Sequence, residues 1–230
     1  VKNLIQSNPA QASEEAGELL KGKNKKNVDL VTSVAHVYLD AGKITEAQEY
    51  LAMAKKANNK DPKVSVLEGD IALAQKNIGQ ACQLYEQAIY FDPNCKEAYL
   101  KYAQAYKSAS PTQAIEKLEQ LKAVDPNCLE ADRELAEVYY SGNRFGKAAE
   151  MYAKFIDTPL ATEDDMLKYA FALFLNHDFE KSLQVAQKGL QKNARHAAFN
   201  RLVMYNNTDL KRYEDAEKAA DAFFLSLIHI

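Results

Sequence analysis

A period of about 34 residues runs through this sequence, and it constrains the fold more than any other feature. Two tetrapeptides, Asp92-Pro93-Asn94-Cys95 and Asp125-Pro126-Asn127-Cys128, lie 33 residues apart, and Asp61-Pro62 lies a similar distance upstream. Proline cannot continue a helix, but it suits the first helical turn. Each Asp-Pro pair therefore predicts the end of one helix and the start of the next.

Small residues extend this frame along the chain. One series is Ala47, Ala81, Ala114, Ala148, Ser182 and Ala216, and a second is Ala35, Gly69, Ala103, Ala136 and Ala170. Large residues lie three positions after members of the second series (Tyr38, Tyr106, Tyr139) and four after members of the first (Leu51, Tyr85, Leu118, Tyr152). These spacings place both kinds of residue on one helical face. The pattern predicts helix pairs that approach closely through small side chains.

The combined pattern resembles the tetratricopeptide repeat, a 34-residue helix–turn–helix unit. The best-matching unit carries Gly69, Ala81, Tyr85, Ala88 and Pro93 at the family's signature places, although the chain has no tryptophan. The resemblance implies an all-α fold, a right-handed superhelical solenoid of stacked helix–turn–helix repeats. An ordinary helical bundle is the rival structure, but a bundle has no reason to keep a constant phase.

Six units follow from this frame, preceded by residues 1–27 as the back part of a truncated leading repeat. The units are 28–61, 62–95, 96–128, 129–162, 163–196 and 197–230, and we expect them to form one continuous solenoid. The third unit is one residue short, between Tyr106 and Ala114, where a turn is expected. Gly42, Gly142-Asn143 and Asn176 are expected at other turn tips, because glycine and asparagine tolerate left-handed backbone.

Composition excludes several classes of function. The formal net charge is −3 with 29 basic and 32 acidic residues interspersed, so no basic field for nucleic acid is expected. No apolar run approaches the roughly 20 residues that cross a bilayer, so direct membrane insertion is not expected. The four histidines, His36, His177, His196 and His229, share no metal-binding spacing. The sequence also lacks a phosphate-binding glycine loop and a GxSxG elbow. We therefore predict no enzyme activity, no cofactor and no metal.

By the resemblance, the fifth, ninth and twelfth positions of each unit line a groove that holds a protein or peptide. We take eleven of them as candidate partner-binding residues: His36, Asp70, Gln104, Lys107, Arg133, Glu137, Tyr140, Phe171, Phe174, Arg201 and Tyr205. The C-terminal members are aromatic or basic, and such residues dominate binding hot spots. We hypothesise that they hold a peptide with apolar anchors and an acidic group. The alternative is that the aromatic rings only fill the core between repeats. The Lys and Asn pair of the family's carboxylate clamp is absent from these positions.

The ends of the chain and its cellular setting support only broad expectations. Val1 in place of Met leads us to expect an upstream segment, and the apolar residues Phe223, Phe224, Leu225, Leu227, Ile228 and Ile230 indicate self-association, a longer repeat array or foreign residues. We predict a non-catalytic interaction scaffold; the alternative is a regulatory or substrate-presenting module of a larger enzyme or membrane-anchored envelope protein. Loops rich in Asn and Lys favour an exported or periplasmic bacterial protein, whereas three cysteines favour the cytoplasm.

Overall fold

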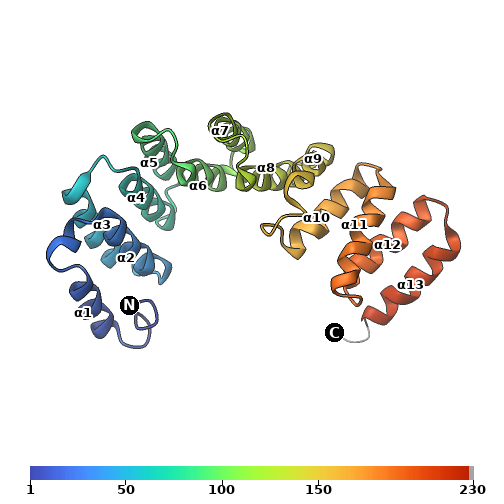
Figure 1. Ribbon diagram of the computed structural model, residues 1–230, viewed down its shortest axis with the longest axis horizontal. Coiled ribbons are helices and arrows are strands. Elements are labelled where there is room, and N and C mark those ends of the chain that lie inside the picture. The colour runs from blue at the N-terminus through green and yellow to red at the C-terminus, as the bar shows by residue number, and fades with distance from the viewer. Residues whose placement is uncertain (228–230) are drawn as a thin grey trace. The chain divides into compact units, whose positions relative to one another are not determined.

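The computed structural model describes residues 1–227, and within them the regular structure is entirely helical, with no strand. Thirteen α-helices and one short 3-10 helix occupy this part of the chain. They are α1 (Pro9–Leu19), η1 (Gly22–Lys26), α2 (Val28–Asp40), α3 (Ile44–Asn58), α4 (Pro62–Ala74), α5 (Ile78–Phe91), α6 (Lys96–Tyr106), α7 (Pro111–Val124), α8 (Leu129–Ser141), α9 (Phe145–Phe155), α10 (Glu163–Leu175), α11 (Phe179–Lys192), α12 (Ala197–Asp209) and α13 (Tyr213–Leu227). Figure 1 shows them as successive hairpins.

The helices belong to two compact units, which we describe separately. Unit 1 comprises residues 1–126 and carries α1 to α7; unit 2 begins at residue 127 and carries α8 to α13. In unit 1 the hairpins are α2–α3, α4–α5 and α6–α7, and in unit 2 they are α8–α9, α10–α11 and α12–α13. Each hairpin falls within one of the six predicted repeats. The exact repeat boundaries and the single continuous solenoid stay predictions.

The small residues do what their spacing predicts. Every member of both series is buried, and Gly69 approaches the Tyr85 ring so closely that an added Cβ would lie 2.5 Å from Cε1. Successive hairpins then bury larger side chains against these surfaces. In unit 2, for example, one cluster joins α10, α11 and α12 through Met166, Ala186 and Phe199. The core is therefore a row of clusters between neighbouring hairpins, as expected of repeats that bury their apolar faces against each other.

Five of the six hairpin turns share one left-handed residue. Positive φ angles occur at Gly42 (74°), Lys76 (64°), Asn143 (56°), His177 (63°) and Lys211 (60°). Each is the fifteenth residue of its predicted unit. The expectation for Asn176 is wrong in detail, because Asn176, the residue that follows α10, has a φ of −90°, and the next residue takes the left-handed conformation.

The turn of the shortened third unit lacks this left-handed residue. Its first helix, α6, has 11 residues, whereas α2, α4, α8, α10 and α12 each have 13. The chain then passes through Ser110 into Pro111, which begins α7 and needs no hydrogen-bond donor there. The one-residue shortfall is thus absorbed by the turn and by the end of α6.

The apolar C-terminal residues form part of α13 as far as the described chain extends. Phe224 and Leu225 are exposed, whereas Phe223 is half-buried. Ile228 and Ile230, like His229, lie outside the described residues. Self-association through this segment stays a prediction. In the described part of the chain, no helix combines the length and apolar character that crossing a membrane requires.

Candidate functional site

A buried carboxylate in unit 1 is held from three neighbouring helices. Asp70 on α4 is 7 % exposed. Its Oδ1 accepts a 2.7 Å hydrogen bond from the Tyr85 hydroxyl of α5, and its Oδ2 accepts a 2.8 Å bond from Lys101 Nζ of α6. His36 Nδ1 of α2 lies 3.6 Å from Oδ2. Burial, and then the adjacent carboxylate, raise the pKa of the Tyr85 phenol, so this hydroxyl stays a donor. Asp70 therefore has little surface left for a partner.

Unit 2 repeats the arrangement at equivalent positions. Glu137 on α8 accepts a 2.8 Å hydrogen bond from the Tyr152 hydroxyl of α9 and a 2.9 Å bond from Lys168 Nζ of α10. Burial alone would lower the Lys168 pKa, but its hydrogen bonds to Asp164 and Glu137 outweigh that effect and raise it. We call each set of acid, tyrosine and lysine an acid triad. Both groove acids chosen from the sequence are members of these triads.

Sequence reasoning missed the triads because it treated each groove position alone. In both triads, the acid is the ninth residue of a predicted repeat and the tyrosine is the twenty-fourth. The lysine is the sixth residue of the next repeat. Repeats with Leu51, Leu118 or Ala186 in place of this tyrosine have no acid at the ninth position; Leu118 is the twenty-third residue of its repeat, which is one residue short. Comparing the repeats with one another, column against column, would have revealed this pairing.

A second ionic contact joins α8 to α10. Arg133 donates from Nε to Asp165 Oδ1 at 3.0 Å, and its Nη2 lies 3.0 Å from Oδ2, so the guanidinium binds the carboxylate with two parallel contacts. Asp165 is only 1 % exposed and also closes a capping box with Thr162 at the start of α10. Arg133, taken as a groove residue, thus connects two repeats through a buried acid.

Four of the predicted residues form one continuous group on α10 and α12, which we call the aromatic–arginine patch: Phe171, Phe174, Arg201 and Tyr205. The Arg201 guanidinium carbon lies 5.8 Å from the centre of the Phe171 ring. The rings of Phe174 and Tyr205 are stacked, with centroids 6.0 Å apart. Cation–π and ring-stacking contacts of this kind are typical of sites that bind through aromatic and arginine side chains.

The patch is divided between core and surface. Phe171 and Phe174 are half-buried and pack on the cluster of Met166, Phe199 and their neighbours, so the core-filling alternative describes part of their role. Tyr205 lies outside that cluster and is 40 % exposed. The patch therefore combines a rigid base of two packed rings with one ring that remains accessible.

The remaining predicted residues do not join the patch. Tyr140 is half-buried and contacts Phe145 edge-on at 5.7 Å; burial raises the pKa of its hydroxyl. Gln104 is exposed and Lys107 half-buried, and both belong to unit 1. His36 contacts the Asp70 triad. Across the described residues, no cluster of three or more His, Cys, Asp or Glu side chains could hold a metal ion.

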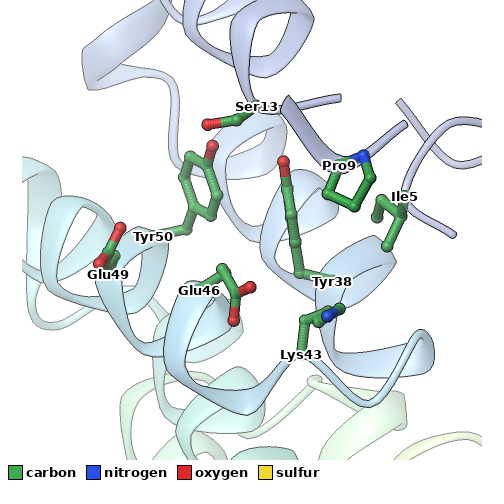
Figure 2. Close-up of a pocket in the computed structure, with 8 residues that line it drawn as sticks. All are labelled: Ile5, Pro9, Ser13, Tyr38, Lys43, Glu46, Glu49 and Tyr50. Atoms are coloured by element: carbon green, nitrogen blue, oxygen red, sulfur yellow. The ribbon is translucent and has the colours of Figure 1, made fainter. Parts of the chain in front are cut away.

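Unit 1 contains a small cavity, which is a second candidate ligand site. It measures about 160 Å³ and lies between α1 and the α2–α3 hairpin, with Tyr38 and Tyr50 stacked at 5.3 Å along one side. In Figure 2 the hydroxyl ends of both rings point toward Ser13 of α1. The Tyr38 hydroxyl is buried with no hydrogen-bond partner among the described residues. Ligand pockets usually enclose about 300 Å³ or more, so this space suits a few water molecules better.

The sequence profile of the family described as Tetratricopeptide repeat matches residues 35–95 and 104–161, just over half of the chain. This protein belongs to the tetratricopeptide repeat family. The first matched segment runs from within α2 through α5, and the second runs from the end of α6 through α9, the first hairpin of unit 2. No curated protein matches the sequence.

Solved structures show the same fold at low sequence identity. The chain is similar to a structure from the functional characterization of Pseudomonas aeruginosa pilF, with a TM-score of 0.67 and 15 % identity over 86 % of this chain and 90 % of that one. It is similar to MamA, with a TM-score of 0.62 and 17 % identity over 72 % and 90 %. It is also similar to YrrB, described as a TPR protein with an unusual peptide-binding site, with a TM-score of 0.57 and 13 % identity over 80 % and 95 %.

Proposed function

We propose that this protein is a non-catalytic interaction scaffold that binds a peptide or protein segment against α8, α10 and α12, with the aromatic–arginine patch as its main contact. The observation that carries the proposal is the accessible Tyr205 ring beside the half-buried Phe174 and the Arg201–Phe171 pair. Rings that are already held in place lose little conformational freedom when a partner binds. The repeat fold supports the same function, since stacked helical repeats present extended binding surfaces.

The groove charges limit what kind of partner can bind. Glu137 and Arg133 are already paired with Lys168 and Asp165, so they contribute little net charge to a partner. The patch itself contains one charged group, Arg201, among three aromatic rings. A peptide with large apolar side chains and no cluster of basic residues fits this surface best.

A peptide selection tests the proposal. Random short peptides displayed without a free C-terminus are selected on the intact chain, and the enriched sequences are synthesised and titrated by fluorescence anisotropy. Tyr205→Ala, which removes an accessible ring, is expected to weaken binding by about 10-fold or more while the melting temperature changes little. Phe174→Ala is expected to weaken binding and stability together, because that ring also packs on the core.

The matched control is Tyr90→Ala, because Tyr90 is 82 % exposed and lies on α5, outside the groove positions. It is expected to leave peptide affinity unchanged. Enriched peptides that bind equally well to wild type and to Tyr205→Ala would rule out the patch as the binding surface. Failure to enrich any peptide would count against peptide binding as the function.

A further inference from the structure

A hollow of about 400 Å³ in unit 2 lies between α11, α12 and α13. Three residues on one face of α12 form its floor: Asn200, Val203 and Asn207. Leu183 of α11 and Ala219 of α13 add apolar surface, and the rim consists of exposed side chains. The aromatic–arginine patch uses a different face of α12, so the hollow is a separate surface and does not depend on the proposed function.

Comparison of the repeats explains why the hollow exists. In two other repeats a polar fourth residue is joined to a polar twenty-sixth residue. The two pairs are Ser65 with Gln87 (Oγ to Oε1, 3.4 Å) and Asp132 with Lys154 (Oδ1 to Nζ, 3.2 Å). In the sixth repeat the fourth residue is again polar, Asn200, but the twenty-sixth is Ala222. The side chain that would reach Asn200 is therefore too short, and the hollow occupies its place.

Both asparagines of the floor are buried, at 4 % exposure each. Asn200 donates from Nδ2 to the Ala194 carbonyl at 3.0 Å, while its Oδ1 accepts no hydrogen bond from a described residue. The Asn207 side chain makes no hydrogen bond with any other described residue, although the fifth repeat has Leu173 at the equivalent place. A buried amide without partners is destabilising, so packing alone does not explain asparagine here.

We propose that the hollow is a subsite for a carboxamide, the side chain of a Gln or Asn presented by a partner protein. A carboxamide has two N–H donors and a carbonyl acceptor. It can donate to Asn200 Oδ1 and exchange a pair of hydrogen bonds with the Asn207 amide. Gln87 shows that such a side chain suits this place in a repeat, because it contacts the fourth residue of its own repeat.

The charges around the hollow favour a neutral group. Arg212 at the rim is already held by Glu180 through Nη1 and Nη2, at 3.2 and 2.7 Å, and Lys218 Nζ lies 3.9 Å from Asp215. The hollow is also open to the surface, whereas sites for free small molecules enclose most of the ligand. A side chain that arrives on a protein surface is covered by that surface, which is why the occupant is assigned to a protein.

The test titrates the intact, ¹⁵N-labelled chain with capped tripeptides, acetyl-Ala-Xaa-Ala-amide, in which Xaa is Gln, Glu or Met. The backbone amides are the same in all three, so differences report the side chain. The Gln peptide is expected to bind about 10-fold or more tightly than the others and to shift the side-chain NH₂ resonances of Asn200 and Asn207. Free L-glutamine should bind more weakly; affinity equal to that of the Gln peptide would overturn the assignment to a protein partner.

Two variants separate binding from structure. Ala222→Gln supplies the carboxamide from within the chain, and it should abolish the preference for the Gln peptide without loss of stability. Asn207→Leu copies the fifth repeat, and it should remove the preference while the melting temperature stays constant or rises, because a buried amide is lost. Glu217→Gln is the matched control, since it adds a carboxamide at an exposed position of α13 outside the hollow and should keep the preference.

Several results would overturn the inference. Equal affinities of the wild-type chain for the three peptides, or shifts that never saturate, would leave the hollow to water alone. A preference for the Gln peptide that survives Ala222→Gln would place the binding elsewhere. If Asn207→Leu unfolds, Ala222→Gln decides alone, because Ala222 is exposed and its replacement disturbs no buried contact.

Discussion

At Asp70, one carboxylate connects four helices, and its contacts account for several neighbouring residue choices. The acid lies on α4, and its partners His36, Tyr85 and Lys101 come from α2, α5 and α6. A buried charge is tolerated only when its lone pairs are used, which is why the tyrosine and lysine accompany the acid in both triads. These contacts fix the position of one repeat against the next within each compact unit.

Removing a tyrosine hydroxyl from a triad should reduce stability according to the burial of the acid. We expect Tyr85→Phe to lower the free energy of unfolding by about 1 to 3 kcal/mol, because it leaves an oxygen of the buried Asp70 without its donor. Tyr152→Phe should have a smaller effect, because the Glu137 side chain is 17 % exposed and water can replace the hydroxyl. Urea unfolding measures both. Tyr90→Phe, an exposed control, should change stability by less than about 0.5 kcal/mol.

The residue before each triad acid matches the length of that acid. Gly69 precedes the short Asp70, and Ala136 precedes the longer Glu137. An Ala at position 69 would place Cβ 2.5 Å from Tyr85 Cε1, and the ring is held by its hydrogen bond to Asp70. We infer that the shorter acid draws its tyrosine closer to the helix and so requires glycine.

We therefore expect Gly69→Ala to destabilise the protein by about 1 to 3 kcal/mol, although alanine favours a helix. Combining it with Asp70→Glu should restore part of that loss, since the longer acid lets the Tyr85 ring move away. The control is Gly17→Ala in α1, where no heavy atom would lie within 4 Å of the new Cβ, and a small gain is expected. Thermal melts of these three variants and of wild type suffice; a double variant less stable than Gly69→Ala would contradict the length-matching argument.

The hairpin turns share one backbone requirement, a residue in the left-handed conformation, in every hairpin except α6–α7. The fifteenth residue is left-handed in five repeats, yet only Gly42 and Asn143 are the residue types that adopt this conformation routinely. Lys76, His177 and Lys211 adopt it because the two helices on either side are already fixed by packing. The third unit avoids the requirement by losing the residue.

Replacing a strained turn residue with glycine should therefore stabilise the fold. Lys76→Gly removes the Cβ that disfavours a φ of 64°, and we expect a gain of about 0.5 to 1 kcal/mol in the free energy of unfolding. The gain is limited because glycine also increases the freedom of the unfolded chain. Gly42→Ala is the reverse test and should lose a similar amount. Equal melting temperatures for Lys76→Gly and wild type would contradict this expectation, because the relief of strain would then not exceed the entropic cost of glycine.

Across the whole molecule, protonated groups are buried in both units, so the protein should lose stability in alkali. Burial, with smaller effects of neighbouring groups, raises the pKa of Tyr50 and of Tyr102 to about 12 and that of Cys82 to about 11. The pKa values of Tyr85 and Tyr152 are raised by the same causes. The folded state therefore holds these protons more tightly than the unfolded chain, whose tyrosines titrate near 10 and cysteines near 8.5.

A group with a raised pKa in the folded state stabilises the protein only while it stays protonated. The stabilising contribution of these groups is fully present below about pH 8, and it falls as the unfolded chain loses protons that the folded chain keeps, through about pH 12. We expect urea midpoints to drop steadily between about pH 8 and pH 11. Tyrosinate absorbance from Tyr85 and Tyr152 should appear together with unfolding and not before it. A midpoint that stays constant over this range would contradict the expectation.

The period, the helix pairing and the burial of both small-residue series followed from the sequence alone, because spacing along a helix decides which side chains share a face. The family resemblance also located the positions at which Phe171, Phe174, Arg201 and Tyr205 come together. The use of Asp70, Glu137 and Arg133 inside the fold could not be predicted, since a single groove position does not reveal its partners 15 to 32 residues away. Only the tertiary structure shows which charged groups are already paired with a neighbouring repeat, because pairing depends on how the helices stack. It also shows that the buried Nε of Arg201 has no acceptor among the described residues.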